Sequence, residues 1–487
     1  MKKQLPLHFE SATRLARLLR ERKVTARELV RMCRSRIEAH NPKLNAVIVT
    51  DYARAETAAR AADRRLGRGE PAGPLDGVPM TIKESFDWIG TPSTWGSTVY
   101  RDNIARSDAV AVERLTRAGA IVLGKTNVPL MLADWQSFND IYGTTNNPWD
   151  ETRAPGGSSG GSAVALATGM SALEIGSDIG ASIRNPAHYC GVYGHKPTFG
   201  IVPMRGHFLP SVFAASDISV AGPLARSAAD LELAMKLLAG PDGIDAEGYT
   251  YRLKASRRRR LSDFRVAVML SDPVSEVDQP VQDLLSRLAR FLESRVGSLS
   301  MTARPEFTTR EAMDVYIALL RAATSRRQSD AEFLANAGKA KELAADDHSY
   351  LAKMLRAQTM AHRDWLSVNH HRHDLRHRWH EFFKNFDLLL CPPASSAAFP
   401  HDHAGERHER TILVNGGKVP TTDQLFWAGY SGAFYLPSTV APVGLTPQGL
   451  PAGVQIVAAE HDDLTAIRFA SLLEREYYAF EPPPAYA

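Results

Sequence analysis

The sequence predicts one α/β domain with a large sheet, mixed and mostly parallel, that carries helices on its faces. Two observations lead to this fold class. Short apolar segments typical of buried strands alternate with longer segments of helical periodicity, and two β-rich segments separated by a turn follow at residues 437–445 and 449–457. A helix over residues 463–475 is expected to close the chain. The length of 487 residues alone would instead suggest two or three domains.

The composition indicates a soluble globular enzyme, with 44% apolar and 23% charged residues. The net charge of +4 is too small to indicate a nucleic-acid partner. Cys33, Cys190 and Cys391 form neither a disulfide framework nor a metal motif, so we expect them to be buried in a reducing compartment. The sequence start lacks the apolar core of a signal peptide, and no apolar stretch approaches the roughly 20 residues that cross a bilayer. We therefore expect a cytoplasmic protein without membrane insertion.

The N-terminal part begins with helical patterns. Apolar residues recur at helical spacing over residues 11–40, and Thr25 followed by Glu28 predicts a capping box at the start of the second helix. Residues 54–68 predict an alanine-rich helix whose arginines face solvent. A strand at 78–82, a helix at 110–118 and a buried strand at 120–124 are expected next.

A Gly/Ser run at residues 156–162 organises the centre of the chain. Flexible linkers share this composition. However, an apolar run of good helix formers that ends in glycine follows at once over 163–169, which indicates a tight loop entering a buried helix. A short strand at 173–176 then turns into another helix. Ser158 and Ser182 therefore lie on glycine-supported turns at helix starts, where backbone N–H groups can bind an anion.

A serine hydroxyl needs activation before it can act as a nucleophile at neutral pH. No serine here has the Gly-x-Ser-x-Gly flanks of a nucleophile elbow. Upstream of both serines, Lys83 stands at the end of the predicted strand 78–82. A lysine serves as a base near pH 7 only where burial lowers its pKa, and a short apolar strand leads into such an environment.

Four motifs carry a resemblance to a known family. They are Gly-Val-Pro-Met-Thr-Ile-Lys at 77–83, Gly-Gly-Ser-Ser-Gly-Gly-Ser at 156–162, Asp-Ile-Gly-Ala-Ser-Ile-Arg-Asn-Pro-Ala at 178–187, and Cys-Gly-Val-Tyr-Gly at 190–194 running into Lys-Pro-Thr at 196–198. In these motifs the chain resembles the amidase signature family, and the resemblance extends over about residues 11–250 and 383–478.

The resemblance implies one amidase domain over residues 1–487. Its parts would be N-terminal helices at 1–70, a catalytic core at 71–245, a variable and mostly helical segment covering the site at 246–383, and a C-terminal sheet with a closing helix at 384–487.

The same resemblance implies hydrolysis of a carboxylic amide without a metal or other cofactor. Ser182 would be the nucleophile, Ser158 the bridging serine after a cis Gly157–Ser158 bond, and neutral Lys83 the base. The implied oxyanion hole consists of backbone N–H groups of Ile179, Gly180, Ala181 and Ser182, which stabilise charge that appears only in the transition state. The implied supporting residues are Ser159, Asp178 and Arg184.

One residue departs from the family pattern inside a motif. The family usually has a second glycine where this chain has Ala181. Alanine there costs free energy if the residue needs a positive φ, and is harmless if it does not. We favour the harmless alternative, because every neighbouring catalytic position is intact.

The segment after the buried strand also resembles the family. Lys-Thr-Asn at 125–127 matches it, whereas Leu130 stands where an acidic or amide residue is common. Because this region lies beside the substrate in the family, Met131, Leu132 and Trp135 are candidates for an apolar wall that contacts the acyl group. The alternative that they are simply core residues remains open.

Between about residues 280 and 383 the chain is helical, polar and without family motifs. The basic run at 257–260 is interpreted as a solvated connector rather than a nucleic-acid patch. His373 and His377 have the spacing of metal ligands on a helix, but the charged surroundings favour an exposed His/Arg face. His188 and His195, near the nucleophile, are either tuning groups or hydrogen-bonded structural histidines, and we favour the latter.

The sequence therefore predicts a free-standing amidase with a small-molecule amide substrate and possible homodimers. Two alternatives stay open. One is a glutamine-hydrolysing subunit of an aminoacyl-tRNA amidotransferase, although no glutamine-recognition pattern is found. The other is a non-catalytic descendant that binds amides or a protein partner, which the intact Lys83, Ser158 and Ser182 disfavour. Aliphatic, aryl, peptide and fatty amides, anilides and esters are all compatible with these residues.

Overall fold

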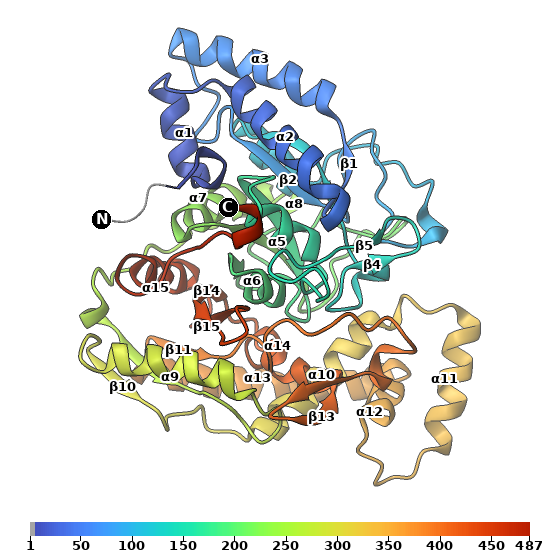
Figure 1. Cartoon of the computed structure of the whole chain (residues 1–487). Helices are drawn as coiled ribbons and strands as arrows, with labels where there is room; N and C mark the ends of the chain where they lie inside the picture. The colour runs from blue at the N-terminus through green and yellow to red at the C-terminus, as the bar shows by residue number, and fades with distance from the viewer. Residues whose placement is uncertain (1–4) are drawn as a thin grey trace.

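The computed structural model describes residues 5–487. Within this range the chain is built around an eleven-stranded mixed sheet. In spatial order the strands are β1 (Val47–Thr50), β3 (Ile121–Thr126), β2 (Pro79–Lys83), β6 (Leu173–Asp178), β8 (Val220–Ala225), β7 (Tyr193–Lys196), β14 (Ser438–Leu445), β15 (Pro451–Ala458), β11 (Leu388–Cys391), β9 (Arg265–Val268) and β10 (Ser298–Ser300). In Figure 1 the N-terminal strands lie towards one end of the molecule and β10 towards the other, as this order requires.

The sheet is mixed, as predicted, but the expectation that it is mostly parallel is wrong. Four of its pairings among the described residues are parallel, namely β2 with β3 and β6, and β9 with β10 and β11. The other six are antiparallel. Part of the reason is local, because β14 and β15 are joined by a short turn, which permits only antiparallel pairing.

Helices cover both faces of this sheet. They are α1 (Ala12–Arg20), α2 (Ala26–Leu44), α3 (Tyr52–Arg68), α4 (Val110–Arg117), α5 (Gly160–Ala167), α6 (Arg184–Cys190), α7 (Ala228–Leu238), α8 (Ile244–Gly248), α9 (Gln279–Glu293), α10 (Thr309–Ser325), α11 (Asp330–Glu342), α12 (Tyr350–Gln358), α13 (His362–Asn385), α14 (Leu425–Gly432) and α15 (Asp463–Glu476). Two small hairpins, β4 (Phe138–Asn139) with β5 (Gly143–Thr144) and β12 (Thr411–Val414) with β13 (Gly417–Pro420), stand outside the sheet. No helix of the described chain is long and apolar enough to span a membrane.

The predicted N-terminal helices are confirmed as α1, α2 and α3. The capping box is also confirmed, because Thr25 Oγ1 accepts the Glu28 N–H at 3.2 Å and the Glu28 carboxylate accepts the Thr25 N–H at 2.7 Å. The central helix α5 is buried along its whole length, as its apolar composition predicts. Gly169, just beyond this helix, has φ = 71°, the conformation typical of a helix C-terminus. Cys33, Cys190 and Cys391 are buried free thiols, as expected.

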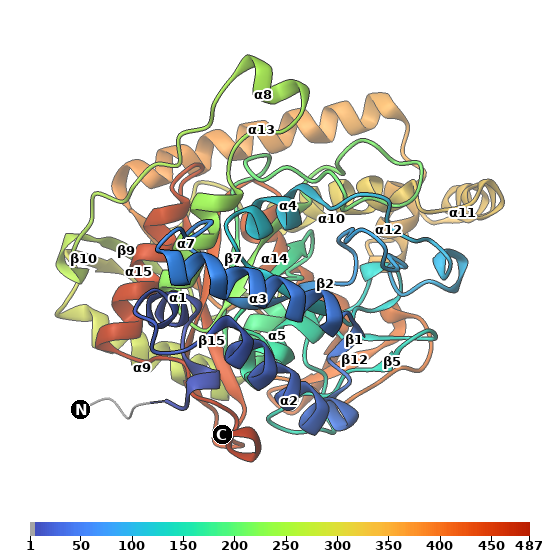
Figure 2. The same ribbon diagram turned by 90° about the horizontal axis from the view of Figure 1, so that it is seen from above.

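The region between β9 and β11 is mainly helical, as predicted, and contains α9 to α13 with only the short strand β10 among them. α10 packs against α12, α13 and α14, whereas α11 lies at the edge of the molecule in both views (Figures 1 and 2). The basic run at 257–260 is mostly exposed, and Arg258 pairs with Asp387 at 2.8 Å. It is a solvated connector, as interpreted.

Candidate active site

Lys83 ends strand β2 in the interior of the protein, where its side chain has no solvent exposure. Its Nζ donates to Ser158 Oγ at 2.7 Å and to Ser177 Oγ at 2.9 Å. β6 is the parallel neighbour of β2, which carries Ser177 to the same edge of the sheet as the lysine. Ser177 was not predicted from the sequence, where the only signal for it is its position directly before Asp178.

Burial lowers the pKa of Lys83 to about 7. Asp178 opposes this shift and the positive charge of Arg327 adds to it. A lysine with this pKa is largely neutral just above pH 7 and can accept a proton. This is the electrostatic condition that a lysine base requires.

Ser158 and Ser182 approach each other from the starts of α5 and α6. The Gly157–Ser158 peptide bond is cis, as the resemblance implies. A Cβ atom on Gly157 would lie 2.3 Å from the Asp134 carbonyl oxygen, so this close approach requires glycine. The Ser159 N–H donates to the Ser182 carbonyl at 3.1 Å, and Ser158 and Ser182 line the same cavity of about 760 Å³. The structure therefore brings the predicted lysine and both serines together.

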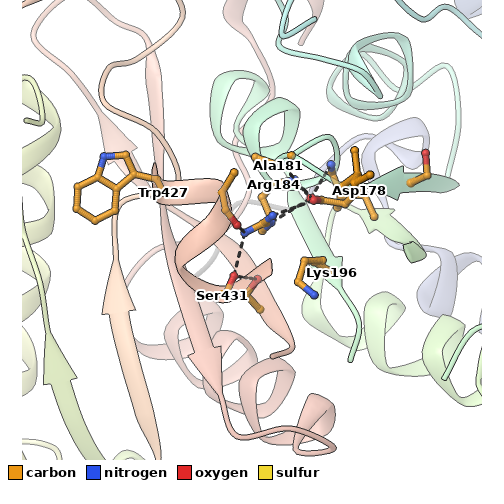
Figure 3. Close-up of polar contacts among 12 residues, drawn as sticks. Asp178, Ala181, Arg184, Lys196, Trp427 and Ser431 are labelled. Carbon is orange, nitrogen blue, oxygen red and sulfur yellow. Dashed lines mark hydrogen bonds and ion pairs between the residues drawn. The ribbon is translucent and has the colours of Figure 1, made fainter. Parts of the chain in front are cut away.

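Asp178 holds the turn that carries Ser182 (Figure 3). Its carboxylate accepts the backbone N–H groups of Ala181 at 3.0 Å and Ile183 at 3.1 Å, and it forms an ion pair with Arg184 at 2.8 Å. Burial alone would raise the pKa of the Asp178 carboxyl, but Arg184, Lys196 and the Ile183 N–H together hold the pKa below its ordinary value.

Arg184 in turn ties this turn to the C-terminal half of the protein. Its Nη1 donates to Gln455 Oε1 at 2.6 Å, to Ser431 Oγ at 2.9 Å and to the Ala428 carbonyl at 3.0 Å, and the contact towards Ser431 is visible in Figure 3. Ser159, the third predicted supporting residue, is buried with its Oγ 3.5 Å from the Ser177 carbonyl oxygen.

Ala181 has φ = 68°, so the expectation that this residue avoids a positive φ is wrong. The left-handed conformation costs a residue with a Cβ about 1–2 kcal/mol. Its N–H donates to Asp178 and is not free to bind an oxyanion. The amides of Ile179, Gly180 and Ser182 remain as candidate oxyanion donors.

Two aromatic side chains hold the carbonyl groups of the same turn. The Tyr316 hydroxyl donates to the Ile179 carbonyl at 3.0 Å, and Trp135 Nε1 donates to the Gly180 carbonyl at 2.7 Å. In a trans peptide the C=O and N–H point in opposite directions, so these bonds fix the direction of the amides that follow. Tyr316 belongs to α10, in the segment without family motifs, and the sequence offered no signal for its role.

The apolar candidates occupy different positions around the site. Met131 and Leu132 line the large cavity with Ser182, together with Trp95, Met204 and Leu209. Trp135 is only 2% exposed and packs in the main hydrophobic core, but it borders a second, smaller cavity beside Ser182. Met131 and Leu132 also line this smaller cavity, so all three candidates border a space beside Ser182, and their contact with an acyl group stays a prediction.

The histidines near Ser182 in the sequence are buried and hydrogen-bonded, as favoured. His188 lies 3.0 Å from the Ser396 carbonyl and accepts the Gly453 N–H at 2.8 Å, and burial lowers its pKa to about 4. His195 contacts Thr439 at 2.9 Å and Asp463 at 3.1 Å.

The His/Arg face of α13 is only partly exposed. His377 is exposed, whereas Arg372 is only 2% exposed. The Arg372 guanidinium packs over the Tyr435 ring and forms an ion pair with Asp217. No group of three potential metal ligands occurs among residues 5–487.

A family model for amidases matches residues 28–466. The chain belongs to the amidase signature family. This amidase is 31% identical to Fatty-acid amide hydrolase 2 of Homo sapiens, over 97% of this chain and 90% of the relative. It is 32% identical to a Glutamyl-tRNA(Gln) amidotransferase subunit of Anaeromyxobacter sp. (strain K), over 95% of each chain. The crystal structure of a bacterial aryl acylamidase from the same family superposes with a TM-score of 0.81, at 26% identity and 97% coverage of both chains. The protein is a hydrolase that acts on amide bonds.

Proposed function

We propose that the amidase hydrolyses its substrate through an acyl-enzyme on Ser182. The observation that carries this proposal is the 2.7 Å hydrogen bond between the buried Lys83 Nζ and Ser158 Oγ. In this mechanism neutral Lys83 accepts the Ser158 proton while Ser158 accepts the Ser182 proton, so that Ser182 Oγ attacks the amide carbonyl carbon. The relay needs no metal or organic cofactor.

The attack moves negative charge onto the carbonyl oxygen. N–H groups of Ile179, Gly180 and Ser182 would bind this oxygen, and one such donor typically contributes about 10²–10³ in rate. The contacts of the turn with Asp178 and Tyr316 support this assignment, because donors already held in place need no reorganisation during the reaction.

The tetrahedral intermediate collapses when the leaving nitrogen receives a proton from Ser158, which Lys83 then reprotonates. Ammonia or an amine departs. Water attacks the ester on Ser182, the same relay accepts its proton, and the carboxylate product leaves with Ser182 regenerated.

The test is release of ammonia and amine over a panel from acetamide through phenylacetamide and anilides to long-chain amides. Activity on part of the panel should disappear in Ser182→Ala and Lys83→Met. Ser162→Ala is the matched control, because Ser162 lies on the same Gly/Ser run but contacts Thr126 at 2.9 Å instead of the relay. Mass spectrometry of the rapidly quenched wild-type enzyme should find the acyl group on the peptide that contains Ser182. Activity that persists in Ser182→Ala would show that Ser182 is not the nucleophile.

The second candidate function is glutamine hydrolysis within an aminoacyl-tRNA amidotransferase. The 32% identity to an amidotransferase subunit favours it. Copurification of partner subunits from the native host, with glutaminase activity that depends on them, would establish this function. Hydrolysis of simple amides by the isolated chain supports the free-standing amidase.

A further inference from the structure

A second cavity of about 220 Å³ lies beside Ser182 and adjoins the large one. The two cavities share Ile179 and Ser182 in their walls. Three arginines, Arg321, Arg327 and Arg407, line the smaller cavity, which we call the arginine cavity. Arg327 borders both spaces. A substrate bound at Ser182 therefore has two neighbouring spaces, and the smaller of them is lined by all three arginines.

Two of the three arginines have buried donors without an acceptor among the described residues, whereas Arg327 donates to the Met131 carbonyl at 2.6 Å. Arg407 Nη1 donates to the Ala133 carbonyl at 3.0 Å, but its Nε and Nη2 are buried without an acceptor among the described residues. Arg321 bonds to the Tyr350 hydroxyl, while its buried Nε likewise has no acceptor there. Buried charged donors without partners are costly, so such a set indicates a site for a ligand that supplies acceptors.

Among the described residues, the acidic side chains near the cavity form no ion pair with these three arginines. Asp134 pairs with Arg410 at 2.6 Å, outside the arginine set. Glu332 is occupied in the capping box of α11, where it accepts the Ser329 N–H and hydroxyl, both at 2.7 Å. Burial lowers the pKa of Arg327 to about 10, so this side chain stays protonated at pH 7. The local balance of charge is positive.

The geometry of Arg407 also suits a planar anion. Its guanidinium packs 4.4 Å from the centre of the Trp135 ring, which fixes its plane, and the two unpaired nitrogens lie on one guanidinium group. Such a pair of N–H groups matches the two oxygens of a carboxylate. Gln328 and Gln358, which also line the cavity, each have a buried amide oxygen without a partner among the described residues, and rotation of either amide would present a further donor.

We propose that the arginine cavity binds a carboxylate group of the substrate, so that the amidase prefers amides that carry an anionic group a few atoms from the scissile bond. The remainder of the substrate extends into the large cavity. This inference rests on the proposed function only in that Ser182 locates the scissile bond between the two cavities.

The test compares amides that differ only in charge. Succinamate is paired with 4-methylpentanamide for the acyl side, and N-acetyl-β-alanine with N-isopentylacetamide for the amine side. In each pair an isopropyl group replaces the carboxylate. We expect kcat/KM of the wild type to be at least ten-fold higher for the anionic member of at least one pair. Arg407→Gln and Arg321→Gln should each reduce this ratio at least ten-fold.

Two further variants control for folding and for general charge. Arg407→Lys keeps the positive charge and should retain part of the preference if Arg407→Gln loses it. Arg363→Gln removes an arginine whose side chain is 90% exposed on α13, and it should leave the ratio unchanged. Equal kcat/KM within both pairs, or a preference that survives both glutamine variants, would overturn the proposal.

A binding measurement separates this proposal from the proposed mechanism. Calorimetry with Ser182→Ala should show saturable binding of the preferred anionic amide. The double variant Ser182→Ala/Arg407→Gln should bind this amide at least ten-fold more weakly. The neutral amide of the same pair should bind Ser182→Ala with much lower affinity than the anionic one. If Ser182→Ala still hydrolyses amides, the nucleophile assignment fails while the binding comparison still decides the carboxylate site. If both partners bind equally, the carboxylate site fails whatever the mechanism.

Discussion

The hydroxyl of Tyr316 lies 3.0 Å from the carbonyl oxygen of Ile179 and donates to it. This contact joins α10, in the segment without family motifs, to the turn that presents Ser182. Trp135 holds the next carbonyl of the turn, that of Gly180, at 2.7 Å. The conformation of the turn that carries Ser182 therefore depends on side chains outside the motifs that define the family.

Tyr316→Phe should slow the chemical step without weakening substrate binding. The variant removes one hydrogen bond of about 0.5–1.5 kcal/mol, so we expect kcat to fall by about three- to ten-fold with little change in KM. Steady-state kinetics on the best amide of the panel measures both. Tyr251→Phe is the control, since that hydroxyl contacts His461 and lies outside both cavities. An equal loss in the two variants would contradict a positioning role for Tyr316.

Trp135→Ala should lower kcat/KM uniformly over short and long acyl amides. The side chain is 2% exposed and supports the Gly180 carbonyl, so its removal disturbs the turn whatever the acyl length. Truncation of a buried tryptophan also costs about 3–5 kcal/mol of stability, which thermal unfolding will detect. A loss confined to long acyl groups would instead assign Trp135 to the acyl-binding wall.

The pH dependence of kcat/KM should show an acid limb with an apparent pKa near 7, the value to which burial lowers the pKa of Lys83. In the proposed mechanism the neutral amine is the base, so activity should fall as pH drops below this value and level off above it. Lys196 is the necessary control, since burial also lowers its pKa to about 7. Lys196→Met should keep the acid limb. Loss of the limb in that variant would show that the group titrating near pH 7 is Lys196 and not Lys83.

Ala181→Gly should be close to neutral in stability and should retain activity. Glycine removes the left-handed cost of about 1–2 kcal/mol but adds about 0.5–1 kcal/mol of chain entropy and loses a buried methyl group worth about 0.8 kcal/mol. The Ala181 N–H bond to Asp178 survives the change. Ala181→Val, with a β-branched side chain at φ = 68°, should be clearly destabilised. Thermal unfolding and kcat/KM of both variants test this, and a ten-fold loss in Ala181→Gly would contradict it.

Arg184→Met should destabilise the fold strongly, because it leaves the Asp178 carboxylate buried without its ion-pair partner. Breaking such a pair costs about 3–5 kcal/mol, and the two side chains are at most 1% exposed. Arg34→Met is the matched control: the Arg34–Glu38 pair lies on the surface, where ion pairs contribute about 0–1 kcal/mol. Comparable thermal midpoints for the two variants would show that the buried pair contributes little.

The sequence predicted those parts of the site that lie within contiguous motifs. Lys83, Ser158 and Ser182 each occupy a short pattern that also determines the local turn or strand. Ser177, Tyr316 and the arginines of the second cavity were missed because their roles arise only from contacts between distant segments. Arg407, for example, begins a short 3-10 helix and donates to the carbonyl of Ala133, which lies 274 positions earlier in the chain.

The fold shows the same division. Helix boundaries followed from caps and periodicity, as at Thr25, because those signals are local. The direction of strand pairing was predicted less well, since apolar runs such as 173–176 do not reveal on which side or in which sense they pair. The positive φ of Ala181 was missed for a related reason, because the hydrogen bonds and packing that impose it are visible only in three dimensions.

The two contacts of the Lys83 amine have a consequence for how the enzyme acquires activity. Its partners Ser158 and Ser177 lie 75 and 94 positions further along the chain. Contacts of such long range form late, since the entropy of closing large loops opposes them. During refolding from denaturant, catalytic activity should therefore return after the helical circular dichroism signal. The recovery of activity then reports the pairing of β2 with β6 rather than the formation of the helices.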